Sequence, residues 1–424
     1  MIKNKLALLG GPKVLKRKLN RFNHIGKEEL NAAKKVIKTG ILSDYIAASG
    51  PNFLGGKKVR EFEKKCEEFF KVKYAITVNS WSSGLTAMVG AINIQPGDEI
   101  IVSPWTMCAS ASAILHWNAI PVFADISLDD YNLDPKSIEA NISPYTKAIM
   151  VVDIFGQSAK MNEINKIAKK YKLKVISDTA QAIGAKYFKK HAGTIGDVGG
   201  YSLNYHKHIH TGEGGIVVTN SASIAKKVRL IRNHAEAVIK SNNKNVLSNM
   251  IGYNFRLGEI ESAIGIEQLK KLPKILKERK KLCKKLISGL ANIKGLNLAN
   301  YSDKIDHVFY SFPIQIDEKI IKVKRYKIAK ALRAEGVLIN KGYTNLHLLP
   351  MYQNKIAYGS QGFPWSSDIC RREISYKKGI CPNAELLNDK TFMSIGISEH
   401  DYNIKDIDNI IEAFNKVWLS LDQL

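Results

Sequence analysis

The chain has 424 residues, of which 45% are hydrophobic and 24% are charged, as in soluble globular proteins that exceed one average domain and bury a large core. Its net charge of +25 raises the alternative of a nucleic-acid-binding regulator, but the lysines are spread along the chain, and neither a clustered basic stripe nor a helix-turn-helix pattern is evident. The five cysteines form no CxxC pair, and neither a secretory signal nor a membrane span of roughly 18 apolar residues is evident, so we expect a cytoplasmic protein without metal, membrane or nucleic-acid partners.

Two helices are predicted before the first strand. Residues 26–39 have a helical period that stops at Gly40, and residues 57–71 have another. Between them lies Gly50-Pro-Asn-Phe-Leu-Gly-Gly56, a run of helix breakers that predicts a loop. We assign residues 1–54 to an N-terminal arm and helix.

Short apolar runs begin at Tyr74 and alternate with helical segments. Strands that are apolar on both faces and alternate with helices predict a mostly parallel sheet between helices. In such sheets, ligands bind at the carboxyl ends of the strands. We assign residues 55–270 to this large domain. The predicted strands are 74–78, 99–103, 121–125, 148–153, 174–178, 198–203 and 215–219, with helices such as 82–93, 107–117, 161–171 and 222–232 between them.

The last third of the chain has a different pattern. A helical stretch runs from Glu259 to about Leu290 and is predicted to be interrupted at Pro273. A smaller mixed region follows, so we assign residues 271–424 to a small C-terminal α+β domain. It contains a predicted strand at 307–315, a helix near 324–335 and an amphipathic helix at 404–419.

Lys207 and Asp178 are the residues that point to chemistry. Taken singly, Lys207 would be a solvated surface lysine and Asp178 a helix N-cap. Asp178 ends a predicted buried strand, where a carboxylate is costly without a partner, and a protonated pyridine nitrogen is such a partner. Lys207 precedes the glycine-rich turn Gly212-Glu-Gly-Gly215, and a lysine with a depressed pKa forms Schiff bases. Together they predict pyridoxal 5'-phosphate (PLP) chemistry.

Polar residues nearby suit the rest of that cofactor. Asn79-Ser-Trp-Ser-Ser-Gly84 places amides and hydroxyls at a predicted helix start, where phosphate binds, and Ser202 can add a hydroxyl. Alone, the serine-rich turn would be a helix cap. Gln181 is a candidate contact to the ring face or to its 3-oxygen.

Three histidines alternate beside the lysine, as zinc ligands sometimes do. His206, His208 and His210 would face one side of an extended segment, but no fourth ligand has a fixed spacing from them. We therefore predict no metal site here.

These motifs resemble the DegT/DnrJ/EryC1/StrS family of sugar aminotransferases, in the fold type I (aspartate aminotransferase) superfamily of PLP enzymes. The resemblance runs from about residue 20 to the C-terminus. It implies an α/β, fold type I PLP-dependent transferase with a mostly parallel central sheet between helices. The motifs, in order, are Pro96-Gly-Asp-Glu99, Ser177-Asp-Thr-Ala-Gln-Ala-Ile-Gly-Ala185, Ser202 through Lys207 to Gly215, and Gly252-Tyr-Asn-Phe-Arg256.

The resemblance also implies roles for individual residues. Lys207 is implied as the Schiff-base and catalytic lysine, Asp178 as the partner of the pyridine nitrogen and Gln181 as a neighbour of the phenolic oxygen. Asn254 matches an asparagine that reaches the phosphate from the partner subunit, which implies a homodimer with sites at its interface. Further implied residues are Trp81, Ser82 and Ser202 around the phosphate, Met107 where many members stack an aromatic ring, and Tyr343 and His347 near the sugar.

The reaction implied by the resemblance is transfer of an amino group from L-glutamate or L-glutamine to the keto group of a nucleotide-linked deoxysugar, for surface glycan or related amino-sugar biosynthesis. A keto-cyclitol or other keto-polyol is an alternative acceptor. A PLP-dependent sugar dehydratase is a further alternative, because one branch of the family has histidine in place of the lysine. The spacing from Ser202 and Gly212 places Lys207, not His206, at that position.

Overall fold

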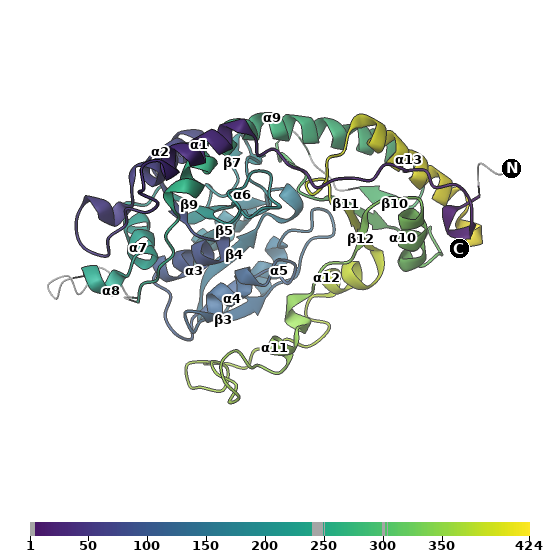
Figure 1. Cartoon of the computed structure of the whole chain (residues 1–424). Coiled ribbons are helices and arrows are strands. Elements are labelled where there is room, and N and C mark those ends of the chain that lie inside the picture. Colours follow the sequence, from purple (N-terminus) through teal and green to yellow (C-terminus); the bar gives the residue numbers. More distant parts are fainter. Residues whose placement is uncertain (1–4, 240–248, 250, 299–301, 303) are drawn as a thin grey trace.

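A seven-stranded sheet forms the centre of the computed structural model, which describes residues 5–239, 249, 251–298, 302 and 304–424 (Figure 1). The strand order is β1-β9-β8-β5-β4-β2-β3, and every pair is parallel except the two that involve β9. This arrangement confirms the predicted α/β fold class. The strands are β1 Tyr74–Val78, β2 Glu99–Val102, β3 Ile120–Phe123, β4 Thr146–Val152, β5 Lys174–Asp178, β8 Val198–Ser202 and β9 Gly215–Thr219.

Helices cover both faces of this sheet because its strands are apolar on both sides. Ile76 and Val217 belong to the buried cluster of α3 and α7, whereas Ala75 and Val218 belong to that of α2 and α9. The helices of this part are α1 Lys27–Ile37, α2 Lys57–Phe70, α3 Trp81–Ala91, α4 Ala109–Leu115, α5 Pro135–Ala140, α6 Met161–Tyr171, α7 Ala222–Arg232 and α8 Ala235–Val238.

One long helix, α9 (Glu259–Leu290), reaches from the large sheet to a second, smaller sheet (Figure 1). The predicted interruption at Pro273 is wrong, because α9 continues through this residue. The small sheet is antiparallel, with order β10-β11-β13-β12. Its elements are β10 Leu296–Leu298, β11 Phe312–Ile316, β12 Ile339–Lys341, β13 Phe392–Ile395, α10 Arg325–Ala334, α11 Pro350–Gln353, α12 Pro382–Leu386 and α13 Ile404–Trp418.

Short elements complete the described structure. A two-stranded hairpin of β6 (Lys186–Tyr187) and β7 (Lys190–His191) lies beside α9 in Figure 1. Within the described ranges, no helix is both long and apolar enough to cross a bilayer. The remaining short turns are 3-10 helices at Ala7–Leu9, Pro51–Leu54, Ile154–Gly156, Leu346–Leu348 and Leu421–Gln423, and a π-helical turn at Leu387–Thr391.

The N-terminal segment is held against a turn near the C-terminus. The backbone N–H of Phe22 donates to the carbonyl of Glu399 at 2.9 Å, and the N–H of Asp401 donates to that of Asn20 at 3.1 Å. His24 Nε2 donates to the carbonyl of His208 at 2.6 Å. These bonds hold residues 20–24 between the turn at Glu399 and the loop that contains Lys207.

A buried ion pair joins α2, β1 and α7. Arg232 is fully buried and donates to Glu63 Oε1 at 2.6 Å and to the carbonyl of Thr77 at 3.0 Å. Glu63 also accepts the N–H of Thr77 at 2.9 Å. Removal of one partner leaves the other charge buried and uncompensated, which costs far more than the pair contributes.

The substitution Glu63→Ala should therefore lower the free energy of unfolding by about 3–5 kcal/mol. The double variant Glu63→Leu with Arg232→Met removes both charges and should recover most of this loss. Urea denaturation followed by circular dichroism measures both variants. Equal stability of Glu63→Ala and the double variant would contradict the claim that an unpaired Arg232 causes the loss.

Candidate active site

A cavity of about 180 Å³ lies at the carboxyl ends of the central strands. Strands β1, β5 and β8 run in the same direction, so the residues that follow them meet at one edge of the sheet. The cavity gathers seven of the residues predicted from sequence, which come from distant parts of the chain: Trp81, Ser82, Met107, Asp178, Gln181, Ser202 and Lys207.

The amine of Lys207 lies in an apolar setting. Its Nζ lies 4.6 Å from the centre of the Tyr310 ring. Burial lowers the pKa of Lys207 to about 8, although the negative charges of Asp178 and Glu399 oppose this shift. A larger fraction of this amine is therefore neutral and nucleophilic near pH 7 than in an exposed lysine.

Asp178 ends β5 and is buried, with 4% of its surface exposed. Its Oδ1 accepts a hydrogen bond from Trp81 Nε1 at 2.7 Å, and its Oδ2 accepts one from Ser110 Oγ at 2.6 Å. These two neutral donors fix the carboxylate plane inside the cavity. The indole N–H of Trp81 is therefore bonded to Asp178, while the Trp81 backbone begins α3, and its place around a phosphate stays a prediction.

The start of α3 provides a site for an anion. Ser80 caps the helix by accepting the N–H of Ser83 at 3.1 Å, and the first helical residues line the cavity. Ser82 is exposed there, and Ser202 lines the same cavity with 3% of its surface exposed. Free backbone N–H groups and hydroxyls at a helix start bind phosphate well.

Gln181 and Met107 lie on other walls of this cavity. Gln181 Oε1 accepts the N–H of Phe155 at 2.7 Å, which turns its Nε2 toward the Tyr343 hydroxyl at 3.5 Å. Met107 lines the cavity with 59% of its surface exposed, and its Sδ accepts the backbone N–H of Ala109 at 3.1 Å. The nearby Trp105 is fully buried and donates to Asn345 Oδ1 at 2.6 Å instead of lining the cavity.

The remaining predicted residues lie outside this cavity. Tyr343 lines a second cavity of about 660 Å³ with Tyr310 and Glu399. His347 is fully buried and its Nε2 bonds to Glu385 at 2.9 Å, so the prediction that it contacts a sugar is not supported by its position. Asn254 is exposed, and its carbonyl accepts a bond from the Asn79 side chain at 3.2 Å.

A third cavity, of about 410 Å³, shares Lys207 with the first and shares Tyr310 and Glu399 with the second. Its walls include Arg21 and His24 from the N-terminal segment. Lys207 thus lies where the cavities converge. Sequence reasoning missed Tyr310, Glu399 and Ser110, because no motif marks them and only the fold brings them to Lys207.

The histidines beside Lys207 do not form a metal site. Burial and the charge of Lys207 lower the pKa of His206 to about 4, so its ring is neutral. In the part of the chain that the structure describes, no group of three metal-binding side chains converges.

The first cavity fits PLP. It offers an amine for the aldehyde, a buried carboxylate for the ring nitrogen and a helix start with hydroxyls for the phosphate. Lys207, rather than His206, is the basic group whose pKa responds to the charge of Asp178.

Solved structures share this architecture. The aminotransferase PseC of Helicobacter pylori, involved in the biosynthesis of pseudoaminic acid, is 26% identical, with a TM-score of 0.76 over 95% of this chain and 100% of that chain. A GDP-4-keto-6-deoxymannose-3-dehydratase with a trapped PLP-glutamate geminal diamine is 25% identical, with a TM-score of 0.75 over 93% of this chain and 99% of that chain. The fold is therefore that of fold type I PLP enzymes, as predicted.

Sequence comparisons lead to the same group of enzymes. The GDP-perosamine synthase of Caulobacter vibrioides is 34% identical over 303 residues, which are 70% of this chain and 79% of that protein. The model of the DegT/DnrJ/EryC1/StrS aminotransferase family matches residues 26–380. The chain is therefore a PLP-dependent aminotransferase that belongs to the DegT/DnrJ/EryC1/StrS family.

Proposed function

We propose that this enzyme transfers an amino group from L-glutamate, or L-glutamine, to the keto carbon of a nucleotide-linked deoxysugar. The observation that carries the proposal is the position of Lys207, which joins the PLP-sized cavity to a larger cavity. The names of the relatives, which include a GDP-perosamine synthase, support a nucleotide-sugar acceptor. Bound PLP supplies an electron sink for the charge that forms at the α-carbon of the donor.

The protein's own residues hold the reacting groups and move the proton. Asp178, oriented by Trp81 and Ser110, would keep the ring nitrogen protonated. The N–H groups at the start of α3, with Ser82 and Ser202, would hold the phosphate. Lys207, once displaced by the donor amine, would carry the proton from the α-carbon. A pKa of about 8 suits this role because the residue can both accept and release a proton near neutral pH.

The second and third cavities have room and polarity for the acceptor. Tyr343 lines the second cavity with the cation Lys341, and Arg21 lines the third. Among the described residues, neither Arg21 nor Lys341 has a carboxylate within ion-pair distance, so both are available to a diphosphate. A keto-cyclitol, the alternative acceptor, has no charge that needs them. A dehydratase reaction is disfavoured because Lys207 stands where that branch has histidine.

Acceptor identity can be tested with protein loaded with pyridoxamine 5'-phosphate. Nucleotide-linked keto-deoxysugars, such as GDP-4-keto-6-deoxymannose, should convert it to PLP with a kcat/KM at least about a hundredfold above that of a keto-inositol, since the nucleotide adds remote binding energy. The variant Lys207→Ala should be slower by roughly 10²–10⁴-fold because it lacks the acid and base. Absorbance follows the cofactor, and mass spectrometry identifies the amino sugar.

Two results of this screen would contradict the proposal. Faster turnover of the keto-inositol would favour the cyclitol acceptor. A deoxygenated keto product without amine would favour the dehydratase.

We further propose that the active unit is a cytoplasmic homodimer in which Asn254 completes the phosphate site of the partner subunit. Its exposed position outside the cavity of its own chain agrees with this role. The neighbouring bridge between Asn233 and Asn254 and the bond from Asn79 hold its backbone beside the start of α3. Each subunit of a twofold-symmetric dimer would then lend one residue to the other.

Subunit mixing tests this arrangement. Homodimers of Lys207→Ala and of Asn254→Ala should each have low activity. A heterodimer of the two contains one intact site, so random exchange of equal amounts should restore about a quarter of the wild-type activity. If Asn254 instead acts within its own chain, each site of the heterodimer carries one of the two substitutions. Mixing then restores nothing beyond the average of the two variants.

A further inference from the structure

Another concave site lies between the end of α2, the β6–β7 hairpin and the middle of α9. This groove has a volume of about 760 Å³ and shares no lining residue with the three cavities around Lys207. We call it the lysine groove. Its lysines are Lys71, Lys186, Lys277, Lys280, Lys281 and Lys284.

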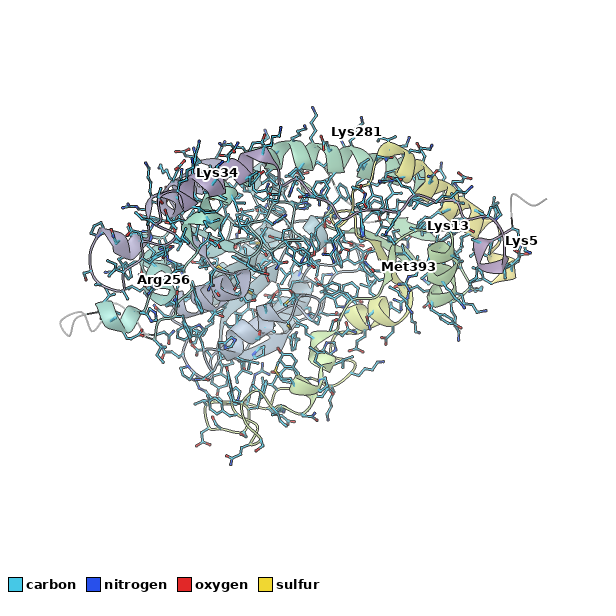
Figure 2. The ribbon with its side chains drawn as sticks, in the orientation of Figure 1. Lys5, Lys13, Lys34, Arg256, Lys281 and Met393 are labelled. Atoms are coloured by element: carbon cyan, nitrogen blue, oxygen red, sulfur yellow. The ribbon has the colours of Figure 1, made fainter. Side chains whose placement is uncertain are left out.

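The sequence prediction that the chain has no clustered basic stripe is therefore wrong. Lys71 follows α2, Lys186 lies in β6 and the other four lie on α9. Four of the six lysines already recur at helical spacing within residues 277–284, and the fold adds Lys71 and Lys186 to them. Figure 2 shows Lys281 at the outer edge of α9, well separated from Lys34 on α1.

The spacing of the four α9 lysines is costly for a free helix. Lys277 and Lys281 are four residues apart, as are Lys280 and Lys284, so like charges lie on one helical face and repel each other. Asp306 compensates only Lys280, at 2.6 Å. Earlier in the same helix, lysines have partners: Lys270 pairs with Glu267 and Lys271 pairs with Glu29, each at 2.7 Å.

The groove therefore has an excess of positive charge with no partner in the described structure. Lys71, Lys186, Lys277, Lys281 and Lys284 are all exposed, and none has a carboxylate within ion-pair distance among the residues that the structure describes. His191 lies in this positive potential. Burial lowers its pKa to about 4, and the charges of Lys186 and Lys71 contribute to the same shift. An anionic ligand would remove this repulsion.

The floor of the groove is apolar and partly aromatic. The half-buried ring of Phe69 lies 5.5 Å from that of His191, and Pro273 and Leu276 continue the surface along α9. Gly184 packs directly against this surface, because a Cβ there would lie 2.5 Å from Leu276 Cδ1. A bare anion would make no use of this surface, whereas a nucleobase stacks on aromatic and apolar side chains.

We propose that the lysine groove binds a nucleoside diphosphate, with its base against Phe69 and Leu276 and its phosphates among Lys277, Lys281 and Lys284. Lysine ammonium groups bind phosphate as point charges and need no fixed fork geometry. The site is separate from the aminotransferase centre, so the proposal stands or falls independently of the acceptor that the enzyme uses.

Residue-resolved lysine acetylation of the PLP-loaded protein separates this site from the active site. ADP is the probe, and mass spectrometry reports the acetylation rate of each lysine. ADP should slow acetylation of Lys277 and Lys281 by about tenfold, which corresponds to about 1.4 kcal/mol of protection. Lys34 and Lys35, exposed on α1, should change by less than about twofold because the Debye length of about 8 Å screens them from the groove.

Calorimetry with matched variants completes the test. Lys277→Gln with Lys281→Gln should weaken ADP binding by about tenfold, whereas Lys34→Gln with Lys35→Gln removes the same charge and should leave it unchanged. Equal weakening by both pairs would show unspecific attraction and overturn the proposal. Equal protection by inorganic pyrophosphate would overturn the role of the base. Protection by phosphatidylglycerol vesicles but not by ADP would assign the groove to a membrane surface and also overturn it.

Discussion

The burial of an amine beside a carboxylate is the constraint on which the active site depends. Removal from water destabilises the charged form of Lys207 and brings its pKa to about 8, while Asp178 and Glu399 limit the shift. Asp178 is held by the neutral donors Trp81 and Ser110 and has no permanent cationic partner at ion-pair distance among the described residues. A protonated ring nitrogen would supply that partner, so the buried carboxylate of Asp178 suits PLP.

The fold places Lys207 and Asp178 in one cavity because the segments that carry them end at the same edge of the sheet. The N-terminal segment also helps to form the site, because it pairs with the turn at Glu399 and lines the cavity that adjoins Lys207. The large and small sheets are linked by α9, which also presents the lysine groove on its outer side. One helix thus borders a proposed anion site while it connects the two parts of the enzyme.

Sequence patterns were sufficient where local chemistry decides the structure. Continuous apolar runs predicted the strands of the central sheet, and spacing identified Lys207 and Asp178 as a pair. Tertiary packing decides what these patterns leave open: the Trp81 indole bonds to Asp178, His347 bonds to Glu385 in the core, and α9 continues through Pro273, where a break was wrongly predicted. Tyr310 and Glu399 could not be predicted, because they are far from Lys207 in sequence. Four lysines of the groove recur at helical spacing in the sequence, whereas their position beside Lys71 and Lys186 depends on the fold.

The most direct test of the central claim is reduction of the PLP-loaded protein with borohydride, followed by peptide mapping. A pyridoxyl group on Lys207, formed in wild type and absent in Lys207→Ala, is the result that the buried amine predicts. The exposed lysines provide the internal control, because their charged amines react poorly. A pyridoxyl group on another lysine, or none after saturation with PLP, would contradict the assignment of this cavity as the catalytic centre.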